Sequence, residues 1–282
     1  MAIIRHILRD PGGLFGLIIL FILLFAAIFG GFLVPHPEAA YETVIWDASL
    51  PPSLDHWFGT DALGRDVFSR VVLGAGLILK ICIVTTAGAA LIGVPLGLIA
   101  GYSNSVIRST ILRVTDVFLA LPQLVLALAF AAVLAPSIET AMIALTLSYW
   151  PMFTRVVYGE TRRIRTLPFI DALEAFGASR FRIIWFHVLP NVAPVIIVRA
   201  TIGFGVSILA ASALGFMGLG ATPPQPEWGL MVSESRGDLP FGWWQATFPG
   251  LAIFFTVIAF NFVGDAARDA IDPTLRRGDR RG

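Results

Sequence analysis

Long stretches without a charged side chain decide what this sequence can fold into. A helix needs about 20 apolar residues to cross the hydrocarbon core of a bilayer. Only 14% of the residues are charged, whereas soluble domains carry about 25%. The sequence therefore predicts an all-α integral membrane protein. The charge-free runs extend over residues 11–36, 81–107, 117–138, 200–226 and 239–264.

Six membrane-spanning helices are expected from these runs and from two shorter ones. The shorter runs, 140–154 and 183–198, become long enough when they borrow residues on one side. The first span is not expected to be a cleaved signal peptide, because its apolar stretch exceeds the about 7–15 residues of a signal core. The expected spans are 13–34, 79–101, 115–134, 139–158, 191–212 and 246–264.

The arginines predict the orientation, because basic residues favour the cytoplasmic side of a membrane. If the N-terminus is inside, only Arg65, Arg70 and Arg236 lie clearly outside. Both termini are therefore expected in the cytoplasm. The arginines expected on the cytoplasmic side are Arg5, Arg9, Arg108, Arg113, Arg155, Arg162, Arg163, Arg165, Arg180, Arg182, Arg268, Arg276, Arg277, Arg280 and Arg281.

Three regions are expected along the chain. Residues 1–78 comprise the first span, a periplasmic segment and a short interfacial helix. Residues 79–268 form a transmembrane domain of five spans, with a cytoplasmic loop at 159–190. Residues 269–282 form a basic cytoplasmic tail.

The residues that lead into and form the second span carry two helical patterns. Residues 66–73 place Asp66 and Arg70 on one side and apolar residues on the other, so this run is expected to lie in the membrane interface. Small residues then recur at four-residue steps, which lets helices approach closely in lipid. We interpret them as a packing stripe, although a helix that slides against a partner would need the same residues. The stripe consists of Ala89, Gly93, Gly97 and Gly101.

Glycine and proline are dense in residues 215–229, which excludes a straight helix. The segment is nevertheless apolar. Irregular backbone at membrane depth is tolerated only where it is buried in protein or lines a cavity. We therefore expect it to dip back into the outer mouth of a pathway; an ordinary outer loop is the alternative. The candidate pathway residues here are Gly215, Phe216, Gly218 and Gly220.

The motifs of common enzymes and metal sites are missing from the sequence. Its one lysine, Lys80, lies in G-L-I-L-K-I, so no G-x-x-x-x-G-K-[ST] phosphate loop exists to bind ATP. The histidines do not cluster in sequence, and Cys82 is expected to be a small buried hydrophobe. We therefore expect no cofactor, no metal and no nucleic-acid partner, and no enzymatic activity in this chain. Transport against a gradient would have to be powered by other subunits.

A long polar interruption extends from Arg155 to Asn191 between apolar runs. A helix-forming segment at 169–176 meets Gly177 there, and a second amphipathic run follows. The interruption is too long for a simple connector and is typical of a docking element for a soluble partner. Most of its arginines are expected only to enforce orientation.

Several separated motifs together identify a family. The sequence contains, in order, H-W-F-G-T-D-A-L-G-R-D-V-F-S-R at 56–70, R-V-T-D-V-F-L-A-L-P at 113–122, the cytoplasmic loop, L-G-F-M-G-L-G-A-T-P-P at 214–224, W-W-Q-A-T-F-P-G at 243–250 and F-N-F-V-G-D-A-A-R-D-A-I-D-P at 260–273. Over residues 55–275 the chain resembles the permease subunits of binding-protein-dependent ABC importers. Within them it is similar to the second permease of the dipeptide, oligopeptide and nickel group.

The resemblance implies the fold and the partners of the chain. It implies the type I ABC importer permease fold in a bacterial inner membrane. It also implies a second, homologous permease subunit, two ABC ATPase subunits that bind ATP and magnesium, and a periplasmic substrate-binding protein. Membrane lipid would surround the spans.

The family's loop signature is E-A-A followed by a glycine and then L-P. Asp171-Ala172-Leu173 stands at the first three positions, so aspartate replaces glutamate and leucine replaces the second alanine. Glu174 is expected to supply part of the acidic contact. By resemblance, the residues that couple to the ATPase are Asp171, Ala172, Glu174, Ala175, Gly177, Ala178, Leu189 and Pro190.

Arg199 is an unusual charge inside the fifth expected span. It lies about 12 Å along the helix from Asn191 at ~1.5 Å per residue. A charge at the bilayer centre costs about 2.5–3.5 kcal/mol, so it should face protein or water. The resemblance implies an uncharged polar residue at this position and a glutamate at Ala211. We hypothesise that Arg199 contacts an acidic cargo; pairing with a carboxylate of the partner permease is the equal alternative.

The leading hypothesis is thus that this chain forms half of the translocation pathway of an importer for small peptides or peptide-like solutes. Nickel chelates, glutathione, and opine or sugar derivatives are alternative cargoes of the same mechanism. An integral membrane enzyme would need convergent ionisable residues within spans, and Asp116, Arg199 and Asp265 are scattered. A passive channel would not need the structured loop before Asn191.

Overall fold

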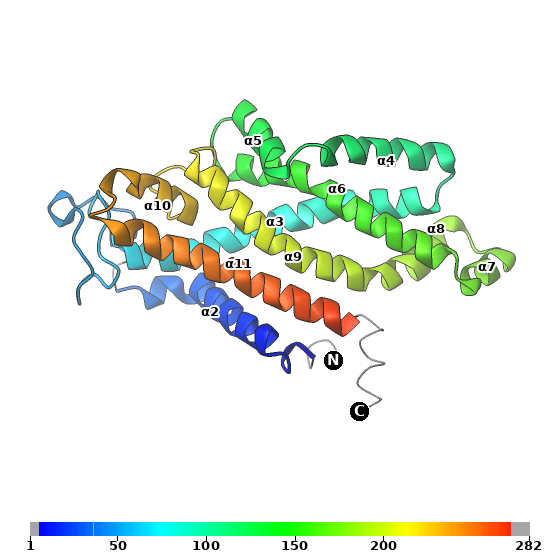
Figure 1. Cartoon of the computed structure of the whole chain (residues 1–282), viewed down its shortest axis with the longest axis horizontal. Helices are drawn as coiled ribbons and strands as arrows, with labels where there is room; N and C mark the ends of the chain where they lie inside the picture. Colours follow the sequence, from blue (N-terminus) through cyan, green and yellow to red (C-terminus); the bar gives the residue numbers. More distant parts are fainter. Residues whose placement is uncertain (1–5, 36, 272–282) are drawn as a thin grey trace.

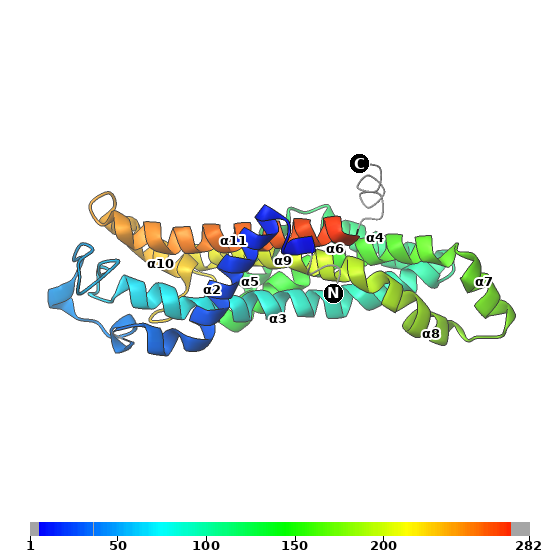
Figure 2. The same ribbon diagram turned by 90° about the horizontal axis from the view of Figure 1, so that it is seen from below.

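The computed structural model describes residues 6–35 and 37–271, and apart from one bridge between Thr60 and Asp66 its regular elements there are all helical. The helices form an elongated bundle, with α7 at one end and α10 at the other in both views (Figures 1 and 2). This confirms the predicted all-α class. The long helices are α2 (Pro11–Leu33), α3 (Val67–Tyr102), α4 (Ser105–Leu119), α5 (Gln123–Val133), α6 (Ile138–Arg165), α9 (Leu189–Phe216) and α11 (Trp243–Ile271).

Four expected spans fall on helices that are long and apolar enough to cross a membrane. These helices are α2, α3, α11, and α9 with the turns that precede it. The span expected at 139–158 falls on α6, whose 28 residues extend to a basic last turn. The bent pair α4 and α5 can count as one further span. The number of six crossings is compatible with these helices and stays a prediction.

The span expected at 115–134 is not one continuous helix. Helix α4 ends at Leu119, α5 begins at Gln123, and the two meet at 86°. Pro122 explains the break, because proline lacks an amide hydrogen and disfavours the helical conformation of the residue before it.

The start of α2 packs against the end of α11, which places both ends of the described chain on the same side of the bundle. Ile7, Ala266 and Ala267 form a buried cluster there. A Cβ atom on Gly13 would lie 3.0 Å from the Cβ of Ala266, so the backbones approach closely. This arrangement fits the predicted orientation, in which both termini share one side.

The closest helix pair is α3 and α6, and glycines make the approach possible. A Cβ atom on Gly93 would lie 2.6 Å from the Cβ of Phe153, with the carbonyl oxygen of Trp150 closer still. One on Gly97 would lie 2.7 Å from the Cβ of Val157. Both distances are far below van der Waals contact. The interpretation of these glycines as a packing stripe is confirmed.

The interfacial helix expected at residues 66–73 does not exist as a separate element. These residues are the cap and the first turns of α3, whose N-cap Asp66 accepts a hydrogen bond from the backbone of Ser69 at 2.7 Å. Arg70 is fully buried and is not on an exposed polar face. The prediction of a separate helix failed because Glu234, which pairs with Arg70, lies 164 positions away in the sequence.

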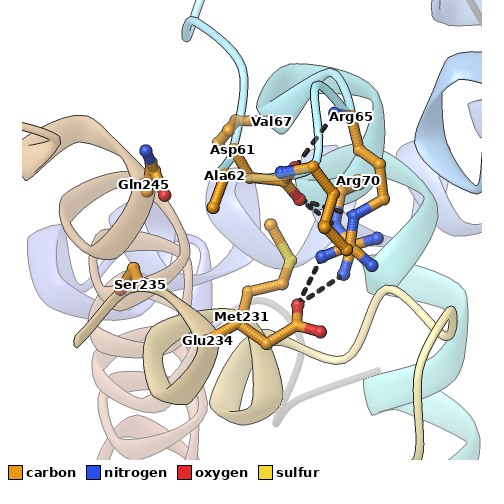
Figure 3. A pocket seen from close by; sticks show the side chains of 10 residues that line it. Asp61, Ala62, Arg65, Val67, Arg70, Met231, Glu234, Ser235 and Gln245 are labelled. Atoms are coloured by element: carbon orange, nitrogen blue, oxygen red, sulfur yellow. Dashed lines mark hydrogen bonds and ion pairs between the residues drawn. The ribbon is translucent and has the colours of Figure 1, made fainter. Parts of the chain in front are cut away.

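Arg70 belongs to a charge cluster at the end of the bundle opposite α7, which we call the outer end. Arg65 pairs with Asp61 at 2.6 Å and with Glu234 at 2.8 Å, and Arg70 pairs with Glu234 at 3.2 Å. Figure 3 shows both guanidinium groups pointing toward the two carboxylates. These four side chains line a cavity of about 270 Å³. Glu234 ends α10 (Trp228–Glu234). The cluster therefore ties the segment before α3 to α10 and α3.

The glycine contact between α3 and α6 predicts a specific stability defect. Gly93→Ala should destabilise the protein by about 1–3 kcal/mol, because the added methyl group meets backbone that cannot move aside. Gly159→Ala on α6 is the matched control, since its Cβ atom would meet nothing within 4 Å. The thermal midpoint in detergent is the measurement. Equal midpoints for the two variants would contradict the close approach.

Candidate functional site

The loop that the sequence predicts in the cytoplasm forms a short helical hairpin at the end of the bundle opposite the charge cluster, which we call the inner end (Figures 1 and 2). It contains α7 (Pro168–Ala175) and α8 (Arg180–Ile183), followed by a turn of π-helix, η3 (Ile184–Val188), which leads into α9. Pro168 occupies the first turn of α7, where its missing amide hydrogen costs no hydrogen bond. The helix therefore starts where the sequence predicts it.

Gly177 ends α7 and turns the chain back toward the bundle. Its φ of +77° lies in the left-handed region, which glycine adopts without steric cost. The backbone amides of Gly177 and Ala178 donate to the carbonyl oxygens of Glu174 and Leu173, both at 3.0 Å. This is the hydrogen-bond pattern of a Schellman cap, which satisfies the last carbonyl groups of the helix.

One side of α7 is buried in an apolar cluster. Ile170 is the fully buried residue of the helix, and Leu173 and Ala178 pack at the edge of the same cluster. The cluster also receives side chains from α3, α6 and η3, so it joins the hairpin to the bundle. Its buried members are Leu98, Tyr102, Val157, Ile164, Ile170, Ile183, Val188 and Val192.

The structure divides the eight predicted coupling residues into two groups. Leu189 packs at the edge of the apolar cluster, and Pro190 is exposed on the first turn of α9. Ala178 is half-buried beside the hairpin turn. The other five residues lie together and exposed at the tip: Asp171, Ala172, Glu174, Ala175 and Gly177.

Phe176 is a prominent residue of the tip that the predicted coupling residues do not include. Its side chain is 90% exposed directly at the end of α7. Phe169 and Phe181, on either side of it in the hairpin, are also exposed. Exposed apolar side chains that gather in one place mark an interaction site. The sequence does contain a signal for this residue, because an aromatic side chain immediately before the glycine of a polar loop indicates a candidate contact.

Arg199 lies beside an aromatic ring on α6. Its guanidinium carbon is 5.2 Å from the centre of the Tyr149 ring, within the range of a cation–π contact. Arg199 Nε and the Tyr149 hydroxyl are buried and have no hydrogen-bond partner within residues 6–35 and 37–271. The contact with the Tyr149 ring was not part of either hypothesis for Arg199, acidic cargo or a carboxylate of the partner permease. Both hypotheses stay untested.

The predicted pathway residues do not form one site. Gly215 lies sixteen positions after Arg199 on α9, which is about 24 Å at ~1.5 Å per residue. Phe216 ends the helix, while Gly218 and Gly220 belong to the turn that follows. The structure therefore separates Arg199 from the glycine-rich segment.

The segment that follows α9 is irregular, as predicted. Its residues 220, 221, 226 and 227 are buried, whereas residues 222–225 are exposed. Glu227 is 2% exposed and caps α10 by accepting hydrogen bonds from the backbone of Gly229 at 2.9 Å and Leu230 at 2.7 Å. Burial raises the pKa of Glu227 to about 7, although these two hydrogen bonds lower it. Whether the segment lies at membrane depth stays a prediction.

The comparison with protein families decides the class of this chain. A family described as "Binding-protein-dependent transport system inner membrane component" matches residues 93–277, which include α6, α7 and α9. A second, described as "N-terminal TM domain of oligopeptide transport permease C", matches residues 2–52. The chain belongs to the binding-protein-dependent transport permeases. It is a permease of an ABC importer, and such permeases work with ATPase and binding-protein partners.

Individual relatives match nearly the whole permease. It is 44% identical to the dipeptide transport system permease protein of Alkalihalophilus pseudofirmus, over 96% of this chain and 89% of that protein. It is 40% identical to a probable D,D-dipeptide transport system permease protein of Escherichia coli, over 91% of this chain and 85% of that protein. The glutathione transport system permease protein of Pectobacterium atrosepticum is 39% identical, over 91% of this chain and 86% of that protein.

A solved structure supports the fold. The permease superposes on a chain of the MetNI methionine ABC transporter, in a crystal form with inward-facing conformations, with a TM-score of 0.59. The match covers 72% of this chain and 97% of that chain at 20% identity. The fold is therefore that of type I ABC importer permeases.

The exposed tip predicts where the ATPase binds. Phe176→Ala should weaken binding of the ATPase about ten-fold, because large aromatic side chains at an interface contribute most to its affinity. Phe241→Ala is the matched control, since Phe241 is 88% exposed and lies two residues before α11. Titration of the purified permease with its ATPase measures the effect. Equal affinities for both variants would place the ATPase contact elsewhere.

Proposed function

We propose that this permease forms one half of a heterodimeric translocation pathway for small peptides or peptide-like solutes. The second half would be a homologous permease, and two ATPase subunits would bind ATP and magnesium at the inner end. A periplasmic binding protein would deliver the cargo at the outer end. The exposed tip of α7 carries this proposal, because a two-turn helix that projects acidic and aromatic side chains suits a groove on a soluble motor.

ATP would drive the cycle through α7. Closure of the two ATPases on ATP would move the tip, and the pathway would alternate between facing the binding protein and facing the cytoplasm. ATP can drive this change only if it binds the closed ATPase pair better than the open one. This chain has no phosphate loop of its own, so hydrolysis is assigned to the partners.

Peptides and glutathione share the chemistry that favours this class of cargo. The relatives are named for dipeptide, D,D-dipeptide and glutathione transport, and all three substrates contain amide bonds and carboxylates. Nickel chelates and opine or sugar derivatives are weaker candidates, because none of these relatives is named for them. Selection among peptides would rest mainly with the binding protein.

Purification of the intact complex tests the proposed assembly. A tag on this subunit, with gentle extraction from native membranes, should recover a second permease and the ATPase subunits in fixed ratio. Quantitative mass spectrometry gives the stoichiometry, and the binding protein encoded with these subunits supplies the ligand. Recovery of this chain alone, even after crosslinking at Phe176, would contradict the proposal.

Arg199 is proposed to favour anionic cargo. Arg199→Gln should reduce uptake of a dipeptide with an acidic side chain about ten-fold, because one buried charge contact is lost. Uptake of a neutral dipeptide of similar size is the internal control and should change little. If Arg199 instead pairs with a carboxylate of the partner permease, the same variant will reduce uptake of both dipeptides equally. Less of the partner permease will then co-purify with it.

A further inference from the structure

Three side chains join α7 to the bundle at the inner end. Tyr102, the last residue of α3, donates its hydroxyl to Oε1 of Glu174 at 2.5 Å. Arg165, the last residue of α6, donates from a terminal guanidinium nitrogen to the carbonyl oxygen of Tyr102 at 3.0 Å. The guanidinium carbon of Arg165 also lies 4.7 Å from the centre of the Tyr102 ring. One tyrosine therefore contacts both α7 and the end of α6.

Tyr102 is the fixed member of this contact. It is 3% exposed and packs in the apolar cluster that contains Ile164 and Ile170. Packing holds its ring, so the hydroxyl has a defined place. Glu174 is exposed, so its carboxylate would turn freely without this partner. A hydrogen bond to an ionised carboxylate is about twice as strong as one between neutral groups.

We infer that the Tyr102 hydroxyl fixes the orientation of α7 on α3 and α6, and that Glu174 is a positioning residue. The loop signature had suggested Glu174 as an acidic contact with the ATPase. Its carboxylate instead points back to the bundle, and the exposed tip residues that remain for the ATPase are Asp171, Ala172, Ala175, Phe176 and Gly177. The inference rests on the proposed function of α7.

This contact matters because α7 is short and weakly held. Only Ile170 of its eight residues is fully buried. Leu173 packs only at the edge of the apolar cluster, so a helix held mainly by Ile170 can rotate about that side chain. The Tyr102–Glu174 hydrogen bond adds a second fixed point near the opposite end of the helix. Movement of the tip is then passed to α3 and α6 and is not absorbed by rotation of α7.

The test uses the complete complex in proteoliposomes. Tyr102→Phe removes one hydroxyl and keeps the ring that Arg165 covers. Recovery of the ATPase should stay unchanged, while transport per ATP hydrolysed should fall about five-fold or more, as for other couplings between distant sites. Tyr158→Phe on α6 is the matched control and should behave as wild type. Equal coupling ratios for Tyr102→Phe and wild type would overturn the inference.

Two substitutions of Glu174 separate positioning from direct contact. Glu174→Gln keeps an oxygen that accepts the Tyr102 hydroxyl and should retain most of the coupling, whereas Glu174→Ala should lose it. The double variant Tyr102→Phe/Glu174→Ala should be no worse than either single one, because all three remove the same bond. If both Glu174 variants lose the ATPase itself, Glu174 contacts the ATPase and the inference is wrong.

Hydrogen exchange tests the inference without the ATPase. In the purified permease, Tyr102→Phe should speed amide exchange of residues 169–176, because α7 loses a fixed point. Tyr158→Phe should not. Unchanged exchange in Tyr102→Phe would overturn the inference whatever partners are recovered. Failure of wild-type protein to recover any ATPase would instead contradict the proposed function.

Discussion

The close approach of α3 and α6 is the contact on which the rest of this permease depends. Lipid tails are as apolar as leucine side chains, so helices in a bilayer associate through close packing and not through the hydrophobic effect. Gly93, Gly97 and Gly101 remove the side chains that would hold the two helices apart. The short distance also allows a hydrogen bond between the two helices, in which the Thr154 hydroxyl of α6 donates to the carbonyl oxygen of Gly93 at 3.2 Å. The pair forms a rigid unit to which the other helices attach.

Helix α3 carries this rigidity from one end of the molecule to the other. Its 36 residues extend about 54 Å at ~1.5 Å per residue. At the outer end, Arg70 is buried among carboxylates that come from the preceding loop and from α10. At the inner end, Tyr102 meets α7. One helix thus connects the side proposed to receive the binding protein with the side proposed to meet the ATPase.

The local sequence pattern was enough to predict those parts of the fold that are determined by residues close together in the sequence. Charge-free runs located the long helices, the four-residue spacing of glycines identified a packing face, and Gly177 marked the hairpin turn. The partners of Arg70 and Glu174 could not be predicted, because they lie 164 and 72 positions away. The helix expected at 115–134 breaks for a local reason, because Pro122 disfavours a helical conformation at the residue before it.

Helix α7 should move as one body with α3 and α6, and a pair of spin labels can measure whether it does. Cys82 is the only cysteine, so a Cys82→Ala background allows labels at two chosen positions. Exposed Ile99 on α3 and Ala175 on α7 are suitable. We expect the same distance between the labels in the nucleotide-free complex and in the ATP-trapped complex. A distance that changes between the two states would contradict that expectation.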